Sequence, residues 1–103
     1  MNMDDFQKQV LQSVVITDKT VTALAHRTLG LTGEAGIISN AMKKAIRDRN
    51  GELTGEDKAL LKERLGDVMY YSAVLAEYAD LNLDEVATAQ LQKSAAFKAN
   101  RSK

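Results

Sequence analysis

The stretch Gly30-Leu31-Thr32-Gly33-Glu34-Ala35-Gly36-Ile37 places three glycines around one carboxylate. The residues that follow continue as a helix, and glycine inside a helix costs roughly 1 kcal/mol relative to alanine. This cost predicts a close approach by another element, with Glu34 projecting from the first turns of its helix. The segment most suited to pack there is Glu63-Arg64-Leu65-Gly66-Asp67-Val68-Met69-Tyr70-Tyr71.

The composition favours an all-α protein. The 103 residues include six glycines and no proline, and alanine, leucine, lysine and glutamate dominate, which favours helices with short connections. We expect one domain over residues 1–103, built as a bundle of four to five helices. A domain of this size leaves roughly a third of its unfolded surface exposed, so oligomerisation would help to stabilise it.

Charge and cysteine content narrow the function classes. Fourteen basic residues balance fourteen acidic ones, so no overall field favours nucleic acid or an anionic membrane. The sequence has no cysteine, and therefore no disulfide, thiolate metal site or cysteine nucleophile. We expect neither secretion nor a membrane span, because no basic stretch followed by an apolar run opens this sequence and no run of about 18 apolar residues occurs in it. We expect a cytoplasmic protein with neither nucleic acid nor membrane as a partner.

Apolar periodicity and capping residues predict two helices in the first half. The first begins at Asp4, and a break with candidate caps follows at residues 17–20. The second begins near Thr20 and ends before Asn50-Gly51, and its glycines mark either a kink or a close helix contact. Its core-facing residues are predicted to be Val21, Leu24, Ala25 and Leu29.

Two more helices are predicted in the second half. Thr54 is a candidate cap for a helix that stops near Asp80. Its residues after Gly66 are apolar on most sides, so it is either central in a bundle or part of a subunit interface. Asn82 and Glu85 have the spacing of a capping box. The last helix carries Val86, Ala89 and Leu91 and is expected to fray from Phe97 onward.

Two carboxylates are expected to meet between the second and third helices. If these helices pair as antiparallel neighbours across the loop at Gly51, Glu34 and Asp67 face one another. Carboxylate oxygens suit magnesium, and a pocket with coordination places left for water and phosphate suits phosphoryl chemistry. The alternative is that both side chains face water, as charged residues on helices usually do.

The segments Gly30 to Gly36, Lys43-Lys44 and Leu65 to Tyr71, in this order, resemble the MazG family of all-α nucleoside triphosphate pyrophosphohydrolases. The resemblance extends from about Ala25 to Lys93. It implies a helical bundle that assembles as a homodimer or homotetramer. It also implies magnesium-dependent hydrolysis of a nucleoside triphosphate to the monophosphate and pyrophosphate.

The metal motif of this family is Glu-x-x-Glu on one helix and Glu-x-x-Asp on the next. Glu34 and Asp67 match its first and last residues and are the catalytic candidates, whereas Ile37 and Arg64 stand at the other two positions. Four carboxylates would carry four negative charges, but Glu34, Arg64 and Asp67 together carry only one. Magnesium gives up its water reluctantly and needs such charge.

Two interpretations of Arg64 follow. In the first, its guanidinium takes the place of the cation and pairs with Glu34 or Asp67, so that neither carboxylate is left uncompensated. In the second, Glu63 replaces the lost glutamate as a metal ligand, because it lies one helical turn before Asp67. We favour the first, since the second leaves Ile37 unexplained.

Further candidates come from the same resemblance. Lys43 and Lys44 would meet phosphate through charge-assisted contacts, unless they only form a solvated basic face near a helix C-terminus. Lys93 aligns with a lysine of the family's last helix. Tyr70 and Tyr71 would stack on a base or fill core and interface space, and an apolar helix favours the second role.

Two functions are therefore expected. One is a pyrophosphohydrolase that uses magnesium held by Glu34, Asp67 and Glu63. The other is a catalytically inactive relative that binds nucleotide or a protein partner as an oligomer. The two missing ligands favour the second function, and the family resemblance favours the first.

Overall fold

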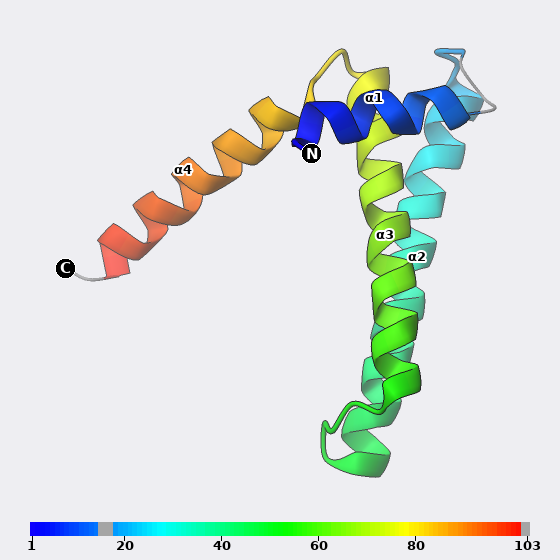
Figure 1. Ribbon diagram of the computed structural model, residues 1–103, viewed down its shortest axis with the longest axis vertical. Coiled ribbons are helices and arrows are strands. Elements are labelled where there is room, and N and C mark those ends of the chain that lie inside the picture. The colour runs from blue at the N-terminus through cyan, green and yellow to red at the C-terminus, as the bar shows by residue number, and fades with distance from the viewer. Residues whose placement is uncertain (15–17, 102–103) are drawn as a thin grey trace.

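The computed structural model of the protein describes residues 1–14 and 18–101. In these residues there are no strands, and the helices are α1 (Met3–Ser13), α2 (Val21–Arg49), α3 (Gly55–Tyr78) and α4 (Leu83–Arg101). The prediction of an all-α chain is confirmed. Helices α2 and α3 pair as a long antiparallel hairpin, α1 crosses the end of α3, and α4 leaves to one side (Figure 1).

Helix α2 runs without a break through its three glycines. A Cβ on Gly30 would collide with the Tyr71 ring on α3, so this glycine marks a close helix contact. A Cβ on Gly33 or Gly36 would meet nothing within 4 Å. The prediction that Glu34 projects from the first turns is wrong, because the helix already begins at Val21 and Glu34 lies near its middle.

The caps of α2 and α3 are those that the sequence predicts. The Thr20 side chain accepts a hydrogen bond from the backbone N–H of Ala23 at 3.1 Å. Asn50 and Gly51 end α2 in the left-handed region, with φ of 55° and 85°. Thr54 caps α3, and its capping box is closed by Asp57. Of the break predicted at residues 17–20, residue 17 lies outside the described part, and residues 18–20 are not helical.

The ends of α1 and α4 differ slightly from the prediction. Helix α1 begins at Met3, one residue before Asp4, because the Asn2 side chain caps it. The Asn82 side chain accepts from the backbone N–H of Glu85 at 2.9 Å, as a cap for α4 should. The last helix was predicted to fray from Phe97 onward. This prediction is wrong for the described residues, because α4 continues as a helix to Arg101.

The buried core is small and made mostly of alanine. Of the residues predicted to face it from α2, Ala25 is exposed, and Val21 and Leu29 are 80% and 71% exposed. Leu24, which was also predicted to face the core, is half-buried. The covered side of α2 includes Ala23, Gly30 and Ala45, and the missing side chain of Gly30 lets the Tyr71 ring approach closely. The buried apolar residues are Ala23, Ala45, Ala73, Val74, Ala76 and Leu83.

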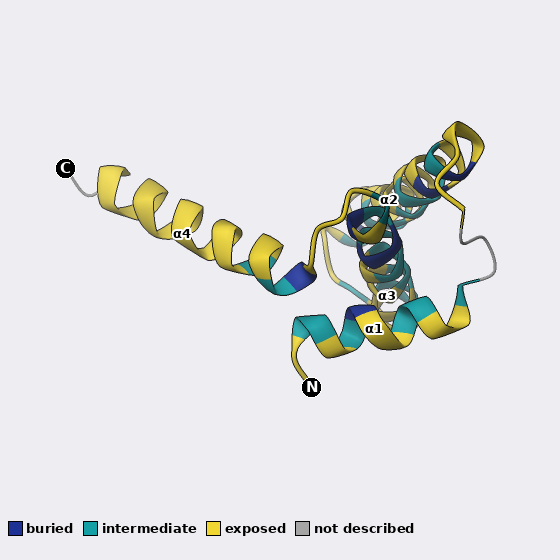
Figure 2. Cartoon of the chain, turned by 90° about the horizontal axis from the view of Figure 1, so that it is seen from above, coloured by how far each residue is buried: buried dark blue, intermediate teal, exposed yellow. Residues whose placement is uncertain are grey.

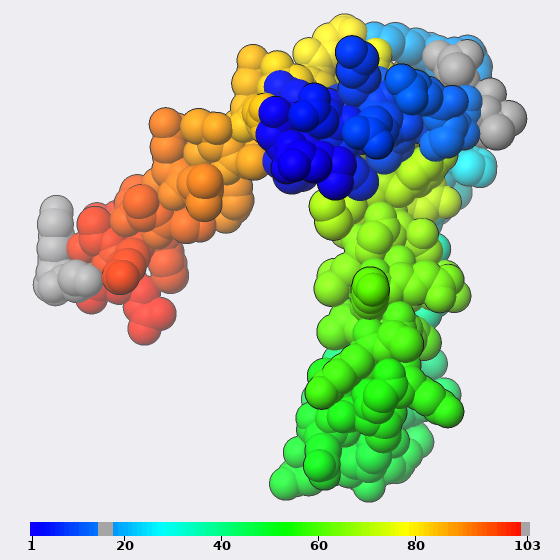
Figure 3. All heavy atoms as spheres, in the orientation of Figure 1, coloured from blue at the N-terminus to red at the C-terminus, as the bar shows by residue number. Residues whose placement is uncertain are grey.

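Helix α3 is the central element, because it packs against both α2 and α1. Helix α4 contacts α1, and after Ala87 all its described residues are exposed (Figure 2). An open angle therefore separates α4 from the hairpin (Figure 3). The radius of gyration is 16.5 Å, against about 13 Å for a compact domain of this length.

None of the helices among residues 1–14 and 18–101 combines the length and the apolar character that crossing a bilayer requires.

Candidate functional site

Glu34, Arg64 and Asp67 meet between α2 and α3, in the middle of the hairpin. Arg64 Nη1 donates to both carboxylate oxygens of Glu34, at 3.4 Å to Oε1 and 3.1 Å to Oε2. The same nitrogen lies 3.8 Å from Asp67 Oδ2, one turn along α3. The ion pair expected of Arg64 is therefore present, and the guanidinium lies between the two carboxylates.

The electrostatics of this cluster fix Arg64 as a cation. The hydrogen bond to Glu34 raises the pKa of Arg64 above its ordinary value, partial burial opposes this, and the charges of Glu34, Glu63 and Asp67 add to it. The Glu34 side chain is only 15% exposed and that of Arg64 30%. Because a largely buried carboxylate needs a partner, the arginine stabilises Glu34 in this position.

One donor of Arg64 remains without a partner. Its Nε is buried and makes no hydrogen bond to the described residues. An unsatisfied buried donor costs roughly 1–3 kcal/mol. The arginine therefore holds its position through the Nη1 contacts rather than through a fully satisfied network.

This cluster has fewer oxygen ligands than the magnesium motif of the family provides. Ile37, which replaces the second glutamate, is 39% exposed and offers no oxygen. Glu63 is exposed on α3, close enough for its charge to act on Arg64. Within residues 1–14 and 18–101, no three His, Cys, Asp or Glu side chains gather as a metal-holding group. At the motif positions, Glu34 and Asp67 therefore supply oxygen ligands, whereas Ile37 and Arg64 supply none.

The predicted phosphate-binding lysines lie apart from this cluster. Lys43 and Lys44 are exposed, nine and ten residues after Glu34 on α2, which places them roughly 14 Å along the helix axis. Lys93 is exposed on α4, which points away from the hairpin in both views (Figures 1 and 2). Within one chain, these lysines and the Glu34 cluster do not form a single site.

The aromatic candidates are packing residues in this chain. The Tyr70 and Tyr71 rings meet edge to face, with centroids 5.3 Å apart. The Tyr71 ring also covers the backbone of Gly30. Both rings are half-buried, so the role in core packing is the one that the contacts support. The lone His26 is exposed.

Two buried polar residues escaped the sequence analysis. Gln7 is 5% exposed and Arg27 6%. Arg27 Nη1 donates to the Val74 carbonyl at 3.2 Å, and its guanidinium lies 5.9 Å from the centre of the Tyr78 ring. Arg27 lies four residues after Ala23 and three residues before Gly30, so the three residues share one side of α2. This spacing could have predicted that Arg27 is buried. Gln7 gives no such signal, because its partners lie at the other end of the chain.

The chain is similar in sequence to a phage protein. A stretch of 74 residues, 72% of this chain, is 43% identical to the Gene 37 protein of Mycobacterium phage L5. The match spans 65% of the length of that protein. No family model matches the chain. No solved structure matches it either.

Proposed function

We propose that the chain is a catalytically inactive relative of the MazG-like pyrophosphohydrolases, and that it acts as an oligomeric binding module. Its ligand is a nucleoside triphosphate or a protein partner. The observation that carries the proposal is the position of Arg64, whose Nη1 bonds Glu34 and lies 3.8 Å from Asp67. A fixed cation there satisfies the carboxylates that a metal would otherwise bind.

The charge of Arg64 favours this proposal over catalysis. A magnesium ion that entered the cluster would meet a guanidinium beside the two carboxylates, and like charges at such distances repel. The magnesium ion could enter only if Arg64 left Glu34, whose side chain is 15% exposed. The metal would therefore have to compete with an ion pair that is already formed inside the chain.

The exposed apolar residues support assembly into an oligomer. Helix α3 exposes 47% of Leu65 and 42% of Met69, and α4 exposes 71% of Leu91 and 63% of Phe97. Exposed apolar side chains gain free energy when an interface removes them from water. A homodimer or homotetramer would cover these residues and close the angle between α4 and the hairpin.

A second candidate is an active pyrophosphohydrolase, and the exposure of Asp67 favours it. Its side chain is 43% exposed, and the exposed Glu63 lies one turn before it on the same helix. In this candidate a metal ion binds these two exposed carboxylates first, and it does so without displacing Arg64 from Glu34. In this candidate Glu34 and Asp67 keep the catalytic role that the family resemblance implies for them.

Pyrophosphate release separates the two candidates. The protein is incubated with a panel of nucleoside triphosphates and Mg²⁺ or Mn²⁺, while light scattering records its mass. Absence of turnover from an assembled protein is the expected result. Robust turnover that Glu34→Ala abolishes would overturn the proposal and establish the enzyme.

Magnesium affinity gives an independent test by calorimetry. The double variant Ile37→Glu with Arg64→Glu restores four carboxylates, and we expect it to bind Mg²⁺ much more tightly than the unmodified protein. The matched control, Ile46→Glu with Lys62→Glu, makes the same charge change away from the cluster and should leave binding weak. Tight binding by the unmodified protein would contradict the role given to Arg64.

A further inference from the structure

One side of α4 carries a symmetric order of residues about Leu91. Residues three, four and seven positions apart lie on the same side of a helix. Small residues stand three and four positions before and after Leu91, an acidic residue stands seven before it and a basic residue seven after it. This side of the helix, called the Leu91 face, consists of Asp84, Ala87, Thr88, Leu91, Ser94, Ala95 and Lys98. A face with this order of residues is complementary to its own copy turned end for end.

Most of the Leu91 face is uncovered within one chain. Leu91 is 71% exposed, and Thr88, Ser94, Ala95 and Lys98 are exposed as well. Helix α4 packs on α1 at its start, where the backbone N–H of residue 84 donates to a carboxylate of α1 at 3.0 Å, and it then leaves the hairpin (Figure 2). A partner can therefore reach the face along most of its length.

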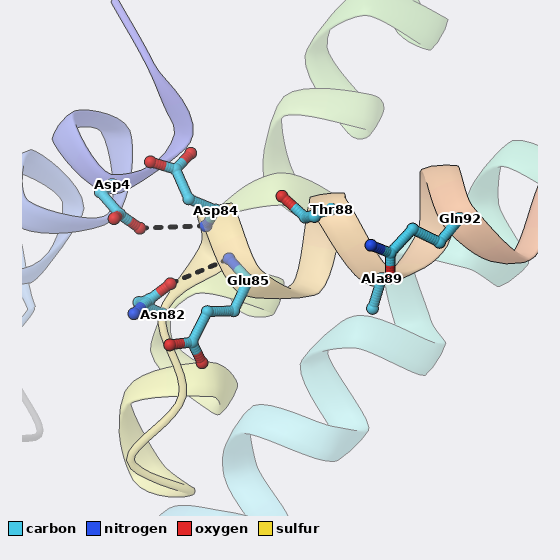
Figure 4. A pocket seen from close by; sticks show the side chains of 7 residues that line it. All are labelled: Asp4, Asn82, Asp84, Glu85, Thr88, Ala89 and Gln92. Carbon is cyan, nitrogen blue, oxygen red and sulfur yellow. Dashed lines mark hydrogen bonds between the residues drawn. The ribbon is translucent and has the colours of Figure 1, made fainter.

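The start of α4 is acidic and its end is basic. Asp4, Asp84 and Glu85 line a hollow of about 440 Å³, and none of its described lining residues is basic (Figure 4). The last turns of the helix carry Lys98 and Arg101. Opposite charges attract across an interface and like charges repel. Two antiparallel α4 helices place each acidic start beside a basic end, whereas two parallel ones would place like charges side by side.

The exposed surface of the chain is large enough for a stable dimer. Its accessible surface is 7556 Å², whereas a compact monomer of the same mass exposes roughly 5,700 Å². A standard protein–protein interface removes about 800 Å² from each partner. The excess surface is therefore about twice what one copy must bury in such an interface.

We propose that α4 pairs antiparallel with α4 of a second copy of this chain through the Leu91 face, about a two-fold axis at Leu91. The two copies of Leu91 pack on each other, each Ala87 packs on an Ala95, and each Lys98 enters the acidic hollow of the other copy beside Asp84. The alanines let the helices approach closely, and the two-fold axis makes every other contact occur twice. The pairing specifies the interface of the proposed oligomer and rests on that oligomer, but it is independent of whether the chain hydrolyses nucleotides.

Single cysteines test the pairing, because the chain has no native cysteine. Leu91→Cys should form a disulfide-linked dimer on mild oxidation, since the two-fold axis places the residue next to its own copy. Ala89→Cys lies on the other side of α4 and is the matched control, which should stay mostly unlinked on a non-reducing gel. Equal linking of the two variants would contradict the proposed face.

A mixture of Ala87→Cys and Ala95→Cys proteins determines the direction of the two helices. An antiparallel pair links residue 87 of one chain to residue 95 of the other, whereas a parallel pair links each variant only to itself. Peptide mapping of the disulfides distinguishes these products. We expect the mixed disulfide to dominate, and self-linked products alone would rule out the antiparallel pair.

Charge reversal tests the contact with the acidic hollow. Lys98→Glu places like charges at both ends of the pair and should raise the dissociation constant of the dimer by about tenfold or more, as measured by analytical ultracentrifugation. Lys93→Glu makes the same charge change on the other side of α4 and should leave this constant unchanged. Equal effects of the two variants would contradict the contact of Lys98.

The same measurements separate this pairing from the proposed function. An assembled protein that does not link through Leu91→Cys would overturn the pairing and leave the proposed oligomer in place. A monomeric unmodified protein would overturn both. Pyrophosphate release by an assembled protein that links through Leu91→Cys would overturn the proposed lack of catalysis and support the pairing.

Discussion

At the scale of single residues, the glycines of α2 show what a sequence can and cannot specify. The stretch Gly30 to Gly36 predicts a close approach, and the Tyr71 ring provides it at Gly30. Nothing in the sequence says which of three glycines meets the ring, because that depends on how α3 is rotated about its axis. The pairing of Arg64 with Glu34 was predictable, since opposite charges were expected on facing helices.

The glycines give a matched pair of variants. Gly30→Ala should destabilise the protein by about 1–3 kcal/mol, because the added Cβ forces the Tyr71 ring to move. Gly33→Ala should instead stabilise the protein by about 0.5–1 kcal/mol, because alanine is the better helix former. The added Cβ would meet no atom within 4 Å. Urea denaturation measures both. Equal effects of the two substitutions would show that the ring does not constrain Gly30.

At the scale of the helices, the sequence predicted the capping residues correctly but did not predict which side of α2 is buried. Thr20, Thr54 and Asn82 each accept a bond from the N–H three residues on, a rule that is local in sequence. The buried face of α2 was predicted to carry Val21, Leu24, Ala25 and Leu29, yet only Leu24 among them is half-buried and the other three are exposed. Which face is covered depends on the partner helix, and this information is not local.

The capping box of α3 predicts a response to mutation and to pH. Thr54→Ala should cost about 1 kcal/mol, and Thr54→Ser should cost little. The backbone N–H of Thr54 lowers the pKa of Asp57, and the Thr54 hydroxyl and Arg49 add to this against partial burial. Stability from a lowered carboxyl pKa is present above the unfolded value and is lost as the pH falls through the folded value.

Asp57→Asn should therefore lower the melting temperature at pH 7, and the difference from the unmodified protein should narrow below about pH 4. Glu56→Gln removes a charge from the same helical turn and serves as the control, with little effect expected at either pH. Thermal melts followed by circular dichroism measure all three proteins. A difference that persists unchanged at pH 3 would contradict the role of the ionised Asp57.

At the scale of the whole molecule, the shape was beyond prediction. An all-α chain of one domain was expected, but a radius of gyration of 16.5 Å reflects the direction of α4. Contacts between Asp4 and Asp84, or Gln7 and Leu83, join residues 76 to 80 positions apart. Periodicity and caps report on neighbours in sequence, so they carry no signal for such pairs.

The exposed length of α4 predicts a dependence on self-association. Most of the stability of a helix in a protein comes from packing of its apolar face, so α4 should be fully helical only where its apolar residues are covered. Leu91→Ser with Phe97→Ser should lower both the mass in light scattering and the helical signal at 222 nm. Thr88→Ser with Gln92→Ser changes two polar residues of the same helix and should lower neither. An unchanged mass for the first variant would exclude these residues from an interface.

The bonds of Gln7 also fix an order of events during synthesis of the chain. Helix α1 is made first, but the carbonyl of Leu81 and the N–H of Leu83 that hold Gln7 are made 74 and 76 residues later. The α2–α3 hairpin, whose contacts are closer in sequence, can form before then. Helix α1 leaves the ribosome before α2, α3 and α4, but it can complete these bonds only after Leu83 is made, and until then Gln7 stays without these partners.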